Sequence, residues 1–253
     1  MKFKSINSIV VFCLFISIFS SCTYVYYPTY PVVPDTKEEG AGIQATIGFT
    51  RAQLSGWYAF DSNFFVTGYF AGALSTLGNS DSTSTRTYNA LSAVIGAGYK
   101  IRATDNFEFQ IQGGIGTCKG HFHTSVFNDF DQSTVFFDEV DVETQSIRGF
   151  VQPSFGFLSK KGSGFYLIPR VTYESFNSVR LSSNFLNNNI QLRNRNFLFT
   201  ELYGLGRINA KVINIDIYMG ASTNLFYSNQ DNGEDSFVAQ PFLFGVGVSR
   251  TFN

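Results

Sequence analysis

The feature that most limits the fold of this chain is a two-residue alternation of apolar and polar side chains. In the segment FEFQIQGGIGT, residues 107–117, the odd positions from Phe107 to Ile111 are apolar and the even positions are polar. Successive side chains of a β-strand point to opposite faces of a sheet, so this segment is expected to form a strand with one apolar and one polar face.

Ten segments with strand character follow residue 40, and no amphipathic helix interrupts them. They cover residues 42–49, 52–60, 64–74, 88–101, 107–118, 145–158, 164–176, 196–208, 213–227 and 238–252. Most of these segments are 11 to 15 residues long. An ordinary strand has about 5 to 6 residues, whereas a tilted strand that crosses a bilayer needs about 9 to 11.

Short and long connections alternate along the chain between these segments. The short ones lie at 61–63, 103–106, 159–163 and 209–211, and the long ones at 75–87, 119–144, 177–195 and 228–237. Short turns at one rim and long loops at the other are typical of outer-membrane β-barrels, in which the short turns face the periplasm and the long loops face the exterior.

The first two segments change phase, because the apolar positions are odd in 42–49 and even in 52–60. A bulge near Thr50 would merge them into one strand and give an odd total, whereas bacterial single-chain barrels have even counts. We therefore expect a tight turn and ten strands, with eight strands as the alternative.

The apolar face of the strands is expected to point outward into lipid. Its members are Phe64, Val66, Phe70, Leu91, Ile95, Tyr99, Phe107, Phe109, Ile111, Val151, Phe155, Phe157, Leu167, Val171, Ile213, Ile215, Ile217, Phe244, Val246 and Val248. So large an apolar surface fits a closed sheet in a membrane, where every backbone group is paired within the barrel. The sequence thus predicts an all-β, antiparallel, up-and-down transmembrane barrel.

The polar face carries equal numbers of opposite charges. Its basic residues are Lys100, Arg148, Arg170 and Arg207, and its acidic residues are Glu108, Glu174, Glu201 and Asp216. An unpaired buried charge costs several kcal/mol, so a narrow lumen favours mutual pairing. An ion-selective pore would instead show one sign of charge along a constriction. We interpret these eight residues as a structural charge network that fills the lumen.

Residues 1–21 are interpreted as a lipoprotein signal peptide. Lys2 and Lys4 precede an apolar core that is too short to span a membrane as a helix. The following Phe-Ser-Ser-Cys resembles a lipoprotein cleavage site, with Phe19 where leucine is preferred. The resemblance implies cleavage before Cys22 and acylation of this cysteine; the alternative is an ordinary signal peptide with an accidental cysteine.

Residues 22–39 contain three prolines and no strand pattern, so they are expected to form a periplasmic tether ahead of a barrel domain at 40–253. An extended Pro-rich chain of this length reaches about 50 Å. No acidic cluster follows Cys22 directly, in contrast to some surface-export signals. The lipid anchor is therefore expected on the periplasmic side of the outer membrane.

Three stretches resemble small outer-membrane barrel proteins of Bacteroidetes, many of which are predicted lipoproteins. They are AQLSGWYAFDSNFFVTGYFAG, IRGFVQPSFGFLSKKGSGFYLIPRVTYESF and the terminal GVGVSRTFN, which is similar to a barrel-insertion signal but has Arg250 and Asn253 at unusual positions. The resemblance implies an outer-membrane location and a barrel shape. The family has no assigned activity.

One segment offers candidate chemistry. His123 and Ser125 resemble the His-x-Ser of lipid A deacylase barrels, with Glu139 downstream, but Val126 follows where asparagine is usual. His121 and His123 form a His-x-His pair without a third ligand nearby. The acidic residues Asp129, Asp131, Asp138, Glu139, Asp141 and Glu143 match no known calcium loop. We expect neither a cofactor, a metal nor a catalytic site.

The function expected from the sequence is non-enzymatic: a lipid-anchored outer-membrane barrel with a structural role or one mediated by its loops. The alternatives are a narrow channel for small solutes, a soluble periplasmic barrel lipoprotein that binds a hydrophobic ligand, and a lipid A-modifying enzyme. A net charge of −1 with 15% charged residues argues against nucleic acid as a partner. The expected partners are outer-membrane lipids, lipopolysaccharide and a protein bound through the extracellular loops; the oligomeric state is left open.

Overall fold

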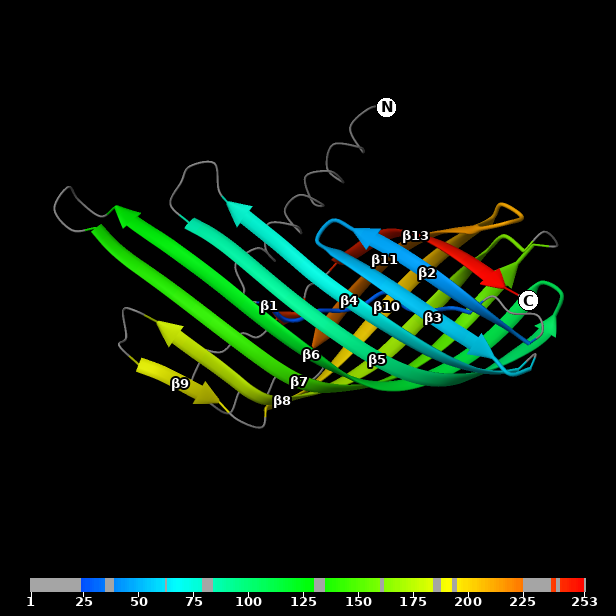
Figure 1. Ribbon diagram of the computed structural model, residues 1–253, viewed down its shortest axis with the longest axis horizontal. Helices are drawn as coiled ribbons and strands as arrows, with labels where there is room; N and C mark the ends of the chain where they lie inside the picture. Colours follow the sequence, from blue (N-terminus) through cyan, green and yellow to red (C-terminus); the bar gives the residue numbers. More distant parts are fainter. Residues whose placement is uncertain are drawn as a thin grey trace, which may run out of the picture.

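The alternating segments form a closed antiparallel barrel of ten strands (Figure 1). The computed structural model describes residues 24–34, 39–61, 63–78, 84–129, 135–159, 162–183, 188–192, 195–224, 238–239 and 242–252. The barrel strands are β2 (Gly40–Gly48), β3 (Arg51–Ala59), β4 (Phe64–Gly78), β5 (Ser84–Thr104), β6 (Phe107–Asp129), β7 (Val135–Leu158), β8 (Gly164–Ser183), β10 (Arg195–Asn209), β11 (Asn214–Asn224) and β13 (Phe242–Phe252). Consecutive strands pair, and β13 pairs with β2 to close the ring.

Three short strands lie outside this ring order. β9 (Asn188–Leu192) pairs with the end of β8, and β1 (Tyr24–Tyr26) pairs with β12 (Val238–Ala239) in parallel. Among the described residues, no helix is long and apolar enough to cross a membrane. The expected signal peptide, residues 1–21, and the expected acylation site, Cys22, lie outside the described residues.

A tight turn joins β2 to β3, as the phase change predicted. Ile47 is the backbone partner of Ala52, and the N–H of Leu74 donates to the carbonyl of Thr50 across 2.9 Å. The turn therefore separates two full strands. The prediction of ten strands is confirmed over the alternative of eight, and β2 begins at the same rim at which β13 ends.

The predicted orientation of the two faces is also confirmed. Side chains of the apolar face point away from the lumen, with Ile95 68% and Phe157 57% exposed. Their neighbours on the polar face are buried, and Gln110 and Gln112 are 2% and 4% exposed. An apolar outer wall around a polar interior is the arrangement that lipid requires.

The segments expected to be long loops are wrong in part, because much of their length continues the strands. β6 and β7 remain paired up to Asp129 and Val135, although residues 119–144 were expected to be a loop. β4 and β5 extend likewise into 75–87, and β8 and β9 into 177–195. Alternating Val, Phe and Thr keep this part of the β6–β7 hairpin in a sheet, and its charged side chains suit a segment above the lipid. Figure 1 shows it projecting farther than the β4–β5 hairpin and the β8–β9 segment beside it.

Two prolines within strands lie opposite one another. The β7–β8 register runs from Val151↔Val171 to Phe155↔Leu167 with no pairing between these rows, which places Pro153 across from Pro169. Neither proline has an N–H to donate, so the ladder is interrupted where they meet. The register is the same on both sides of the gap. The prolines therefore mark an interruption in the pairing without a shift of register.

Candidate functional site: the occupied lumen

The lumen of the barrel contains a segment of the chain itself. Residues 24–34, here called the strap, run inside the ring of strands, and every residue from Tyr26 to Pro34 is buried (Figure 1). Tyr30 is 0% and Val32 1% exposed. The expectation that residues 22–39 form a tether outside the barrel is therefore wrong for 26–34.

Polar side chains of the barrel wall bind the backbone of the strap. Six of the seven carbonyls from Pro28 to Pro34 each accept a hydrogen bond from an inward-facing arginine or glutamine. The pairs are Arg51 to Pro28, Arg170 to Thr29 (2.9 Å), Gln53 to Tyr30 (2.9 Å), Gln152 to Val32 (3.2 Å), Arg207 to Val33 (3.0 Å) and Gln110 to Pro34 (3.1 Å). The N–H of Tyr30 donates in return to Gln53 Oε1 across 2.9 Å.

The composition of the strap explains this pattern of bonds. Pro28, Pro31 and Pro34 recur every third residue, which suits the three-residue turn of a polyproline II helix. Such a helix has no internal hydrogen bonds, and proline has no N–H, so mainly carbonyl acceptors remain to be satisfied. Arginine and glutamine are long donors, and the wall supplies them at these positions.

Aromatic and apolar side chains of the strap fill the remaining space. Tyr30 lies over Gly48 and Gly245, where an added Cβ would come within 1.9 and 2.5 Å of its side chain. Tyr27 stacks on Tyr88 with ring centroids 4.7 Å apart. The wall thus has glycine where a tyrosine of the strap approaches closely.

The eight charged residues singled out in the sequence form four pairs. Arg148 lies 2.9 Å from Glu174, Arg207 2.7 Å from Asp216, Arg170 3.6 Å from Glu201 and Lys100 4.0 Å from Glu108. Three of the pairs are direct backbone partners on adjacent strands. Their side chains are at most 5% exposed, so each charge has its partner inside the lumen.

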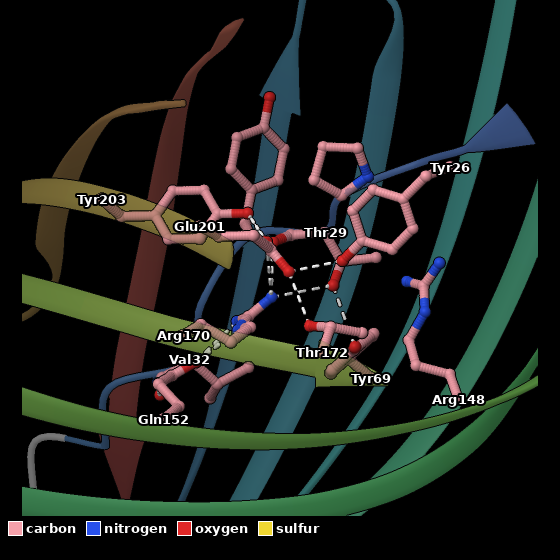
Figure 2. Close-up of polar contacts among 12 residues, drawn as sticks. Tyr26, Thr29, Val32, Tyr69, Arg148, Gln152, Arg170, Thr172, Glu201 and Tyr203 are labelled. Carbon is pink, nitrogen blue, oxygen red and sulfur yellow. Dashed lines mark hydrogen bonds and ion pairs between the residues drawn. The ribbon is translucent and has the colours of Figure 1, made fainter. Parts of the chain in front are cut away.

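Glu201 is the centre of one cluster that joins wall and strap (Figure 2). Its carboxylate accepts hydrogen bonds from the hydroxyls of Tyr26, Thr172 and Tyr203, the Thr172 bond being 2.6 Å long. The ring of Tyr26 also lies under the guanidinium of Arg148, 4.8 Å from its centroid. A strap residue thus contacts two of the four ion pairs.

Arg170 connects the same cluster to the middle of the strap. It donates to Gln152 Oε1 through Nε and Nη2, at 3.0 and 2.6 Å, and through Nη1 to the carbonyl and hydroxyl of Thr29, at 2.9 and 3.2 Å. The hydroxyl of Thr29 lies 2.9 Å from that of Tyr69 on the opposite wall. The strap is therefore held from both sides of the lumen.

The histidines lie on the outer wall, away from this site. His123 Nδ1 and His121 Nε2 lie 2.8 and 3.3 Å from the same oxygen of Asp141. Ser125 and Glu139 are direct backbone partners in the β6–β7 hairpin, and their side chains are outside the described part of the chain, as are those of Asp129 and Asp138 and all of Asp131. Among the described residues, no group of three or more His, Cys, Asp or Glu side chains is arranged to hold a metal ion.

The sequence reasoning found the charged residues and missed the strap. It also omitted Arg51, Gln53, Gln110 and Gln152, whose role is to bind the strap's carbonyls. A signal existed in the three-residue spacing of the prolines, combined with tyrosines too apolar for a solvated tether. Long amides on the inner face were a second signal, because they can donate to carbonyls of a segment inside the lumen.

No protein-family model matches the chain, and no curated protein does. Among solved structures, the translocator domain of the autotransporter NalP from Neisseria meningitidis is similar with a TM-score of 0.50, at 10% identity over 86% of this chain and 90% of that one. A major outer membrane protein from Thermus thermophilus has a TM-score of 0.36, at 12% identity over 85% and 99% of the two chains. CarO from Acinetobacter baumannii has 0.38, at 8% identity over 86% and 99%. The likeness to the NalP translocator domain shows the fold of an outer-membrane β-barrel.

Proposed function

We propose that this chain is a non-enzymatic outer-membrane barrel, lipid-anchored through Cys22, whose lumen is sealed by its own strap and which acts through the rim that carries the long connections. The observation that carries the proposal is the strap, which occupies the interior with six carbonyls bound by the wall. A solute path would have to displace those bonds and separate four ion pairs.

The sealed lumen disfavours the two alternatives that need an open interior. A narrow channel needs a continuous aqueous path, and a hydrophobic ligand needs an empty apolar cavity. Here the interior is filled, since Tyr30 and Tyr203 within it are 0% exposed, while apolar side chains such as Ile95 and Phe157 cover the outside. A barrel with this polarity is suited to lipid around it and to a solid core within.

The outer wall near the β6–β7 hairpin supports contacts with lipid headgroups. A pocket of about 440 Å³ is lined by Lys119, His121 and Glu143 among others, next to the exposed apolar side chain of Leu91. Mixed charges directly above an apolar belt fit the phosphates and bridging cations of lipopolysaccharide. Beyond the last pairings with β5 and β8, the tip of the hairpin, residues 127–129 and 135–139, offers a short sheet edge for a protein partner.

Single-channel recording in planar bilayers tests the seal. The full-length protein is expected to give no conductance steps, and a variant that lacks residues 24–34 is expected to give steps because the lumen then holds only side chains of the wall. Both proteins should show a heat-dependent shift in gel mobility, which establishes that the deletion still forms a closed barrel. Regular steps from the full-length protein would contradict the proposal and favour the channel.

The absence of catalysis is tested separately. Deletion of the gene is expected to leave the lipid A species of the cell unchanged in a mass spectrum. A lipid A species that disappears on deletion, and that the wild-type protein restores but Ser125→Ala does not, would establish the enzyme alternative.

A further inference from the structure

The contacts of the strap are ordered along the barrel axis. We call the rim with the connections β3–β4, β5–β6, β7–β8 and β10–β11 the short-turn rim, and the opposite one the long-loop rim. Pro34 binds Gln110, three residues from the start of β6 at the short-turn rim, and Val33 binds Arg207, two residues from the end of β10 there. Both contacts lie at the short-turn end of the lumen.

The next residues of the strap bind farther from that rim. Val32 binds Gln152, six residues from the end of β7, and Thr29 binds Arg170, six residues into β8. Pro28 then binds Arg51, the first residue after the β2–β3 turn, which belongs to the long-loop rim. The direction from Pro34 to Pro28 is therefore from the short-turn rim to the long-loop rim.

The first described residues continue in the same direction. Tyr27 packs on Tyr88, which lies 16 residues from the short-turn end of β5, and on Cys118, which lies 11 residues into β6. Tyr24 pairs with Val238 of β12, within the connection between β11 and β13, and this connection is at the long-loop rim. Figure 1 shows β1 at the end of the strap that lies nearer the long hairpins.

The length of the strap matches the thickness of a membrane. The 10 steps from Tyr24 to Pro34, at about 3.1 Å each in a polyproline II conformation, span about 31 Å. The hydrocarbon core of a bilayer is about 30 Å thick. A strap with one end at the short-turn rim is thus long enough to reach the other side.

We propose that the chain threads its own barrel and displays its N-terminal end, with the lipid-bearing Cys22, on the outer face of the outer membrane. Cys22 is two residues before Tyr24, which is a reach of at most about 7 Å. The acyl chains would then enter the outer leaflet beside the long-loop rim, opposite to the periplasmic anchor expected from the sequence. This inference rests on the strap of the proposed function, but it concerns the rim at which the N-terminal end of the strap leaves the barrel. Whether the strap closes the lumen to solutes is a separate question.

An epitope inserted between Thr23 and Tyr24 tests the side of exit. Antibody is expected to bind intact cells as strongly as it binds a control with the same epitope in the β4–β5 connection, between Gly78 and Ser84. A second control has the epitope in the short turn between Asp105 and Asn106 and should bind only after the outer membrane is permeabilised. An epitope before Tyr24 that behaves like this second control would overturn the proposal.

A smaller change gives the same readout if the insertion prevents folding. Thr23→Cys is expected to react with a membrane-impermeant maleimide on intact cells, and Asp105→Cys only after permeabilisation. The native Cys118 is 4% exposed and contributes little background. If Thr23→Cys is labelled only in permeabilised cells and the protein gives no conductance steps, the exit of the strap on the outer face is refuted and the closed lumen is not. If Thr23→Cys is labelled on intact cells and the protein gives conductance steps, only the closed lumen is refuted.

Discussion

Truncation of one carboxylate in the lumen provides a quantitative test of how dry the interior is. Glu201→Ala removes the partner of Arg170, and the side chains of this pair are 0% and 2% exposed. The loss of one partner from a buried ion pair costs about 3–5 kcal/mol, because the remaining charge stays buried without compensation. The hydroxyls of Tyr26, Thr172 and Tyr203 lose their acceptor at the same time. We expect the unfolding equilibrium to shift by roughly two to three and a half orders of magnitude.

The assay is a urea titration of the barrel in lipid vesicles, followed by fluorescence. The chain has 1 tryptophan, Trp57, and its side chain is 5% exposed in the lumen, so its emission reports unfolding of the interior directly. Glu201→Gln is the matched variant, since it keeps the size and one oxygen acceptor of the side chain while it removes the charge. It is expected to be less destabilising than Glu201→Ala.

A small effect would refute the reasoning. If Glu201→Ala lowers the free energy of unfolding by less than about 1 kcal/mol, Arg170 behaves like an exposed partner in water. The lumen would then be hydrated around the strap, and the strap would not seal it. A double variant, Arg170→Met with Glu201→Leu, is expected to recover much of the barrel stability, because apolar replacement of both partners removes the uncompensated charge.

Three further outcomes are expected, two for the strap and one for the wall. Gly245→Ala is expected to loosen the strap and to give conductance steps, since the new Cβ would lie 2.5 Å from the ring of Tyr30. Gly206→Ala is the control, because nothing lies within 4 Å of its Cβ, and steps from both variants or from neither would contradict this. Cys118 is expected to resist maleimide in the native protein and to react in Tyr27→Ala, and equal rates in the two proteins would mean that Tyr27 does not cover it. The barrel is expected to stay in the membrane after a carbonate wash and to migrate differently in SDS with and without boiling, and release by the wash would contradict the transmembrane wall.

The wall of the barrel could be predicted because its strands follow a local pattern in the sequence. A two-residue period, long segments and alternating turn lengths determine strand number, face and topology without any knowledge of distant contacts. The charge pairs could be anticipated for the same reason: Arg148 and Glu174, for example, are inward-facing residues of adjacent strands, and balance within a narrow lumen demands partners.

The position of the strap could not be predicted, because it depends on contacts with residues far away in sequence. The proline spacing and the tyrosines of residues 24–34 indicate a packed segment, but they do not show where it packs, because the arginines and glutamines that bind it belong to strands far away in sequence. The β6–β7 hairpin was misjudged for a different reason. Polar residues such as His121 and Glu143 indicated a loop, but paired strands above the membrane tolerate them, because the backbone pairing does not depend on lipid.

The strap also has a consequence for the order in which the molecule forms. The hydroxyl of Tyr26 reaches Glu201, 175 residues away in sequence, so the strap's contacts exist only once most of the wall has been made. Contacts between such distant residues are slow to form, because a long loop must close first. A finished barrel would have to admit a chain that carries lipid at its end, whereas an open sheet can curl around a segment already in place. The final pairing of β13 with β2 is then the step that traps the strap, and a barrel without the strap should close along a different kinetic route.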